Sequence, residues 1–174
     1  VGITSFQDAS HLNSISSWNY FKKLKDNLPE MPRITVMPGY KHIQDFIASE
    51  LRYGAGDDHL RVGHTKVLLS QASGSLHPQP EAIKAMVSEA NLQGFPIAIH
   101  AVEETEVEAA LEALESNGNR AIRNRIEHCS ICPPSLTTRL KELNIVIATQ
   151  PSFIYYGGDR YLCEVPKEQL PHLY

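Results

Sequence analysis

The fold is decided by residues 95–128, which read FPIAIHAVEETEVEAALEALESNGNRAIRNRIEH. Two short segments that are predicted as strands, Phe95–His100 and Arg125–His128, flank a helical pattern that runs from Glu103 to Ser116. Within that pattern one apolar stripe recurs at the spacing of an amphipathic helix, formed by Val107, Ala110, Leu111 and Leu114. A strand, a helix and a second strand in this order make the βα unit of a parallel sheet.

The same alternation extends over the whole chain. Strands are predicted at Ile3–Phe6, Arg33–Met37, Thr65–Leu69, Phe95–His100, Arg125–His128 and Ile145–Gln150. Helices are predicted at Leu12–Leu24, His42–Leu51, Pro80–Leu92, Glu103–Ser116 and Ser135–Leu143, followed by a loop over Pro151–Asp159 and a helix start within Glu164–Leu173. Six βα steps fit either an open doubly wound sheet or a (β/α)8 barrel. No G-x-G-x-x-G follows the first strand, which disfavours a dinucleotide-binding fold.

Length and composition narrow the function classes. The 174 residues suit a single domain with its own core, and 42% apolar residues are typical of a globular chain. The formal net charge of −4 disfavours a nucleic-acid partner. Apolar runs such as Ile145–Thr149 are far shorter than the ~20 residues that cross a bilayer, so we expect no membrane partner either.

The three cysteines stand at positions 129, 132 and 163. An odd number at irregular spacing does not indicate a disulfide framework, so we expect reduced thiols and a cytoplasmic location. Cys129 and Cys132 form a C-x-x-C, for which three interpretations remain open: packing within a loop, a redox pair, and half of a metal site.

Two histidines end neighbouring predicted strands. His100 follows Ile97–Ile99, and His128 closes Arg125–His128. Ligands of parallel α/β folds bind at the carboxyl ends of the strands, so both imidazoles are expected at one mouth. Imidazole is the commonest protein ligand of zinc and similar ions, and a metal held there would activate water near neutral pH. The alternative is a pair of core histidines, each hydrogen-bonded to the backbone.

Lys66 lies inside the apolar segment Thr65–Leu69. An unpaired lysine is costly to bury, so one interpretation has it facing outward or pairing with a carboxylate. The other directs its amine into the mouth, as a base or as a carbamate that bridges metals.

Together these segments resemble the amidohydrolase superfamily. The resemblance rests on Gly2–Ser5 with Asp8, Lys66-Val67 with Ser73-Gly74, Ile99–Ala101, Arg125–His128 and Thr149–Pro151. The branch that they resemble is amidohydrolase family 3, the group similar to N-substituted formamide deformylases. The resemblance implies a metal-dependent (β/α)8 barrel that hydrolyses amide-like C–N bonds with a metal-activated water. It implies metal-binding and catalytic roles for His100, His128 and Lys66, the last as a carboxylated lysine, and a divalent metal, zinc first, in the full-length protein.

The sequence departs from this family at both ends of its motif series. The H-x-H pair of the first family strand and the aspartate of the last are not found in these residues. We therefore expect a partial TIM barrel that matches family strands two to seven, without the flanking strands and the small β-sandwich. By itself such a piece is expected to be inactive, to bind metal weakly or not at all, and to form homo-oligomers through exposed barrel edges at Ile3–Phe6 and Ile145–Thr149.

The expected substrate is a small molecule. Gln150 ends the last predicted strand, and Tyr155 and Arg160 lie in the aromatic segment that follows it. These three residues are predicted to bind substrate, with the aromatic segment packing on its own barrel as the alternative. A second function remains open, namely a non-catalytic barrel-like binding domain with structural histidines at its mouth.

Overall fold

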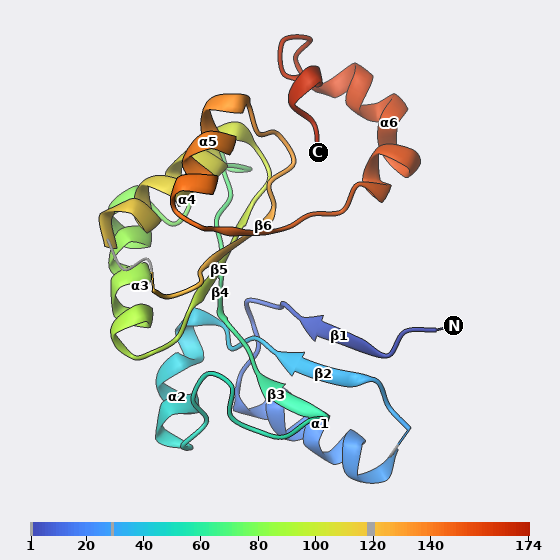
Figure 1. Ribbon diagram of the computed structural model, residues 1–174, viewed down its shortest axis with the longest axis vertical. Coiled ribbons are helices and arrows are strands. Elements are labelled where there is room, and N and C mark those ends of the chain that lie inside the picture. The colour runs from blue at the N-terminus through green and yellow to red at the C-terminus, as the bar shows by residue number, and fades with distance from the viewer. Residues whose placement is uncertain (1, 29, 118–120) are drawn as a thin grey trace. The chain divides into compact units, whose positions relative to one another are not determined.

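The computed structural model describes residues 2–28, 30–117 and 121–174. The elements follow one another along the chain as Figure 1 shows. The strands are β1 Ser5–Asp8, β2 Arg33–Val36, β3 Leu60–Val62, β4 Thr65–Leu68, β5 Ile97–Ala101, β6 Arg125–His128 and β7 Val146–Ala148. The helices are α1 Ile15–Asn27, α2 Ile43–Ala48, α3 Pro80–Leu92, α4 Glu104–Asn117, α5 Pro134–Glu142 and α6 Ser152–Glu164, with 3-10 turns η1 Tyr40–His42 and η2 Leu170–His172.

The chain divides into two compact units. The first comprises Val1–Val67 and Glu89–Ile97, and the second comprises Leu68–Ser88 and Ala98–Tyr174. A parallel sheet with the order β1-β2-β3 belongs to the first unit. A second sheet has the order β4-β5-β6-β7, in which β5, β6 and β7 run parallel. Helices between successive parallel strands supply the crossovers that such strands require.

The core of the first unit lies between its sheet and its helices. Ile34 and Val36 of β2 and Leu60 and Val62 of β3 are buried. Trp18 of α1 meets Phe46 of α2 edge-on, with ring centroids 6.5 Å apart. Burial of these apolar groups is the main force that holds the unit together.

The core of the second unit lies where α3, α4 and α5 cover one side of β5 and β6 (Figure 1). Ile99 and Ile126 are neighbours in register on these strands, and both are fully buried. The apolar stripe predicted for the helix after β5 is confirmed, because the side chains on it are buried: Val107, Ala110, Leu111 and Leu114. Leu136 and Leu140 of α5 are also buried.

The structure corrects three sequence predictions. The short strand β3 was not predicted; it pairs with β2 in register Ile34↔Leu60. The segment Pro151–Asp159, predicted as a loop, lies mostly within helix α6, Ser152–Glu164. The predicted helix start within Glu164–Leu173 is also wrong, since α6 ends at Glu164 and the only helical turn after it is η2.

Strands β1 and β7 each end a sheet in the strand order. The side chains of Ser5–Gln7 in β1 are exposed, and those of β7 are half-buried.

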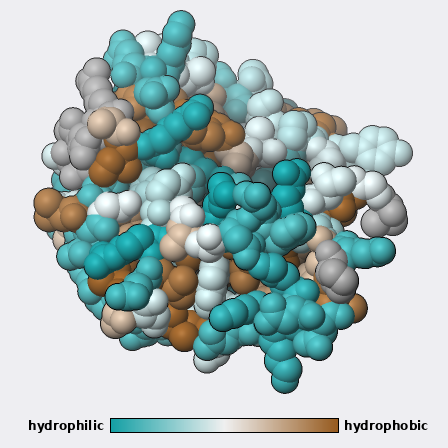
Figure 2. Space-filling model, turned by 60° about the horizontal axis from the view of Figure 1, so that its bottom comes forward, coloured by the Kyte–Doolittle hydropathy of each residue, from teal (hydrophilic) through white to brown (hydrophobic). Residues whose placement is uncertain are grey.

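On the face drawn in Figure 2, hydrophobic residues stand in small groups among hydrophilic ones. Within the described residues we find no helix with the length and apolarity that a membrane crossing needs.

Candidate functional site

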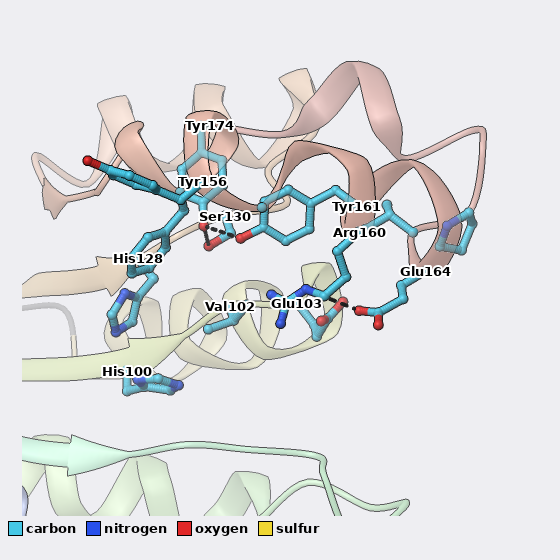
Figure 3. Close-up of a pocket in the computed structure, with 14 residues that line it drawn as sticks. His100, Val102, Glu103, His128, Ser130, Tyr156, Arg160, Tyr161, Glu164 and Tyr174 are labelled. Atoms are coloured by element: carbon cyan, nitrogen blue, oxygen red, sulfur yellow. Dashed lines mark hydrogen bonds and ion pairs between the residues drawn. The ribbon is translucent and has the colours of Figure 1, made fainter.

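The two strand-end histidines lie against each other in the second unit (Figure 3). The ring centroids of His100 and His128 are 4.5 Å apart, with 70° between the ring planes. Both side chains are half-buried, so the rings are held by protein on one side and remain reachable on the other. The predicted approach of these imidazoles is therefore observed.

The strand register alone would not bring the rings together. His100 pairs with Glu127, and His128 pairs with Ala101. Paired residues of adjacent strands share a face, and successive residues alternate between faces. A regular strand would therefore direct His128 to the face opposite His100.

The backbone leaves the strand conformation at His128. Its φ is +74° and that of Cys129 is +51°, both in the left-handed region that non-glycine residues seldom adopt. The N–H of Cys129 donates to the carbonyl of Ala101 at 2.8 Å, which ties the turn to β5. Such conformations cost about 1–3 kcal/mol each and gather at functional sites. This turn is the feature that lets His128 share the face of His100.

Gln150 orients His128. Its Oε1 lies 2.7 Å from Nδ1 of His128, while its Nε2 donates to the carbonyl of Ala148 at 3.4 Å. Because Oε1 can only accept a hydrogen bond, Nδ1 must carry the proton. In the neutral imidazole this leaves the lone pair of Nε2 available, which is the tautomer that a metal ligand at Nε2 needs.

A buried ion pair supports the end of β6. Nε of Arg125 and Oε1 of Glu127 are 2.5 Å apart, and their side chains are 11% and 7% exposed. Removal of either partner from such a pair leaves an uncompensated buried charge, at a cost of about 3–5 kcal/mol. In the sequence Arg-Ile-Glu-His, the two charged residues therefore brace the strand that presents His128.

The loops after β4 and β5 are joined by Glu106, whose side chain is buried. Its Oε2 accepts hydrogen bonds from the N–H groups of Val102, at 2.7 Å, and Glu103, at 3.2 Å. Its Oε1 accepts one from the N–H of Gln71 at 2.9 Å. One carboxylate thus caps the start of α4 and fixes the backbone two and three residues beyond His100.

A pocket of about 640 Å³ opens beside the histidines. Figure 3 shows His100 and His128 at one end of it and Arg160 with Glu164 at the other. The lining is completed by Val102, Glu103, Ser130, Phe153, Tyr156, Gly157, Tyr161, Val165, Pro166 and Tyr174. Aromatic rings and two histidines at a half-open cavity are suited to an organic ligand with an apolar group.

Charged and hydroxyl groups of the pocket wall are already engaged with one another. Nε of Arg160 lies 3.4 Å from Oε2 of Glu164, and its guanidinium stacks over the ring of Tyr161, 5.4 Å from the centroid. The hydroxyl of Ser130 donates to that of Tyr174 at 3.0 Å. Burial raises the pKa of Tyr174, so this phenol stays protonated over the physiological range.

Glu103 is a pocket residue that the sequence did not single out. Burial, and then the charge of Glu106, raise the pKa of its carboxyl group. In the sequence it was only the first residue of a predicted helix. Tyr174 was missed as a lining residue for a similar reason, because nothing in the local pattern places the end of the chain beside the histidines. Tyr156 and Tyr161 belong to the aromatic segment that was expected after the last predicted strand, and both line the pocket.

Of the other predicted site residues, some lie at the pocket and others do not. Arg160 lines the pocket, whereas Tyr155 is 84% exposed and is not among the described lining residues. Gln150 contacts His128, as described above. Lys66 lies in β4, in the part of that strand that belongs to the first unit. It is 5% exposed, which excludes the alternative in which its amine faces solvent.

The comparison with known families decides where the chain belongs. Residues 2–172 match the amidohydrolase family. The chain belongs to this family. Among curated proteins, Protein LONG AFTER FAR-RED 3 of Arabidopsis thaliana is 32% identical over 84 residues, which cover 46% of this chain and 14% of that protein.

Solved structures share the fold at low identity. An uncharacterized metal-dependent hydrolase from Pyrococcus horikoshii OT3 superposes with a TM-score of 0.78 and 20% identity, over 98% of this chain and 37% of that one. Guanine deaminase from C. acetobutylicum, with guanine bound, superposes with a TM-score of 0.58 and 12% identity, over 90% of this chain and 42% of that one. The likeness confirms the predicted partial barrel, and the chain spans well under half the length of either structure.

The histidine pair fits part of a metal site. Imidazole nitrogens are a donor type that zinc and similar ions take, and the hydrogen bond with Gln150 orients one of these two rings. Over residues 2–28, 30–117 and 121–174, no three His, Cys, Asp or Glu side chains gather closely enough to hold an ion. The chemistry of these two side chains therefore suits part of a divalent-metal site.

Proposed function

We propose that this amidohydrolase-family chain is the central part of a metal-dependent hydrolase that cleaves amide-like C–N bonds. The observation that carries the proposal is the contact between His100 and His128 at the ends of adjacent parallel strands, in a mouth that opens into an aromatic-lined pocket. Family membership over residues 2–172 supports it. The finer assignment, also proposed, is a deacylase similar to the N-substituted formamide deformylases.

His100 and His128 would hold the metal, which we propose is zinc, together with ligands that these two do not provide. Lys66 remains the proposed third ligand and catalytic residue. A divalent ion at this position supplies water of lowered pKa and polarises a carbonyl oxygen. We further propose that the 174-residue chain alone is inactive, because two imidazoles make up half of an ordinary four-coordinate zinc site.

The residues around the histidines have separate tasks in this proposal. Gln150 holds the Nδ1 proton of His128 and keeps Nε2 facing the site. The rings of Phe153, Tyr156 and Tyr161 would receive an apolar substituent of the amide and exclude water. Arg160 would meet an anionic group of the substrate when its contact with Glu164 opens. Tyr155 is retained as a proposed substrate contact at the rim of this wall.

The remaining proposals concern the partners and the cellular location of the protein. The substrate is a small molecule, with neither nucleic acid nor membrane as a partner. Reduced thiols support a cytoplasmic location, since all three cysteines are free of disulfides.

The test uses the full-length protein and its variants His100→Ala and His128→Ala. Metal content is measured by elemental analysis, and hydrolysis is followed on a panel of N-formyl and N-acyl amines. We expect each variant to lose metal and to lose several orders of magnitude in kcat/KM. His11→Ala, a change at an exposed histidine, is the matched control and should retain both. Full activity in both pocket variants would reject the metal-hydrolase proposal, and ligand binding without any turnover would favour the non-catalytic binding domain.

A further inference from the structure

The C-x-x-C motif lies at the turn that follows the histidine of β6. Cys129 comes directly after His128 and is 5% exposed, whereas Cys132 is half-buried and stands two residues before α5. The two side chains lie near enough to interact with each other. The third cysteine, Cys163, is exposed on α6 and provides an internal comparison.

The surroundings of Cys132 favour its thiolate. Its sulfur lies 3.6 Å from Oγ1 of Thr137 in the first turns of α5, and its N–H donates to the carbonyl of His172 at 2.9 Å. Thiols before a helix N-terminus are stabilised as thiolates by the unpaired N–H groups and the helix dipole. The hydrogen bond from Cys129, and then that from Thr137, lower the pKa of Cys132 to about 6, against the opposing effects of burial and of Glu104.

The environment of Cys129 differs in the direction that a resolving thiol requires. Its side chain is 5% exposed, so an outside reagent reaches its sulfur less readily than that of the half-buried Cys132. One partner of the pair is therefore a partly accessible nucleophile, and the other is a sheltered thiol in contact with it. Attack by an outside reagent is directed to Cys132.

We propose that Cys129 and Cys132 form a redox-active dithiol, with Cys132 as the attacking thiol and Cys129 as the resolving thiol, that a small peroxide converts to an intrachain disulfide. The Cys132 sulfur attacks one peroxide oxygen, the O–O bond breaks, and a sulfenic acid forms as the other oxygen leaves as water. The Cys129 sulfur then attacks the Cys132 sulfur, the S–O bond breaks, and the hydroxyl leaves with the Cys129 proton as a second water. Two thiols lose two electrons, and one peroxide is reduced to two waters.

The disulfide would close a small ring that contains Ser130 and Ile131. Ser130 lines the pocket, donates its hydroxyl hydrogen to Tyr174, and accepts the backbone N–H of Tyr174 at 2.8 Å. Oxidation would therefore reach the pocket wall directly through the backbone. This redox site does not depend on the proposed hydrolysis, since neither sulfur takes part in it.

The experiment treats the full-length protein with hydrogen peroxide, with EDTA present, and scores the peptides that carry the three cysteines by mass spectrometry after thiol alkylation. We expect a Cys129–Cys132 disulfide within one chain, with a loss of two mass units, while Cys163 remains alkylatable. The variant Cys163→Ser should behave identically. In Cys129→Ser, dimedone should trap a sulfenic acid at Cys132, and in Cys132→Ser oxidation of Cys129 should slow at least tenfold.

The wild-type measurement is decisive even if a variant at the buried Cys129 fails to fold. Oxidation of Cys163 at the rate of Cys132 would overturn the proposal. So would a product in which Cys132 joins only to other chains, or a Cys129–Cys132 pair that stays reduced while Cys163 is oxidised.

Discussion

Replacement of Glu106 by alanine should loosen the site without direct contact with the histidines. Its buried carboxylate accepts three backbone hydrogen bonds, from Gln71, Val102 and Glu103, at 2.7–3.2 Å. Hydrogen bonds to a charged acceptor contribute about 1.5–3 kcal/mol each. The low end applies because the three donor residues are half-buried and water can replace part of the loss. Three such bonds give a destabilisation of about 4–5 kcal/mol.

A loss of this size is measurable by urea unfolding followed by circular dichroism at fixed protein concentration. For a chain of this length it corresponds to a fall in Tm of roughly 10–15 °C. Glu106→Gln keeps one acceptor oxygen and should give an intermediate loss. Glu112→Ala, an exposed position on the same helix, is the matched control and should change stability by less than about 0.5 kcal/mol.

Hydrogen exchange separates the proposed cause from general destabilisation. The amides of Gln71, Val102 and Glu103 should lose protection in Glu106→Ala more than the amides in the middle of β6 do. A destabilisation no larger than that of Glu112→Ala, or unchanged exchange at those three amides, would refute the reasoning.

Three further predictions concern other parts of the chain. In the full-length protein, Gln150→Ala should weaken metal binding by roughly 10–100-fold, because Nδ1 of His128 loses its hydrogen-bond acceptor. Gln150→Glu keeps an acceptor and should bind the metal nearly as the wild type does. Titration with zinc measures the affinities, and equal affinity of Gln150→Ala and the wild type would contradict the prediction. The hydrogen bond from Lys25, and then the N–H groups of His59 and Leu60, lower the pKa of Asp57, so the stabilisation is present above the ordinary carboxyl pKa near 4 and is lost as the pH falls. Asp57→Asn should therefore be less stable than the wild type at pH 7 and approach it below about pH 4 in urea unfolding, and a difference independent of pH would show that the ion pair does not act this way. We propose that the 174-residue chain self-associates through the edges at β1 and β7; light scattering should give a dimer or larger species, and a monomer at all concentrations would contradict this.

Regular periodicity explains which elements could be predicted. Helix α3 and strand β6 have the predicted bounds, Pro80–Leu92 and Arg125–His128. In α3 a proline at the first turn and an apolar face specify the helix locally. Strand β6 pairs with β5 on one side and with β7 on the other, and both of these neighbours were also predicted as strands.

The missed elements lack such local information. β3 is three residues long, too short to display a period, and exists through its pairing with β2. Gly157 and Gly158 argued for a loop because glycine weakens helices by about 1 kcal/mol each. Helix α6 forms over them, and Phe153 and Tyr161 at its two ends pack edge-on or tilted against Tyr174, a contact between distant positions that no local pattern reveals.

The sequence by itself determined the chemistry of the candidate site: two imidazoles, each at the end of a predicted parallel strand, with a lysine in a third strand. It did so because strand ends of this fold meet at one edge whatever the details of packing. Only the tertiary structure showed how the imidazoles meet, since the register sets His100 beside Glu127 and the left-handed turn at His128 brings the second ring to the face of the first. It also decided that Gln150 orients His128 and that α6 forms the pocket wall, because hydrogen bonds and ring contacts between distant segments depend on how the strands and helices are brought together.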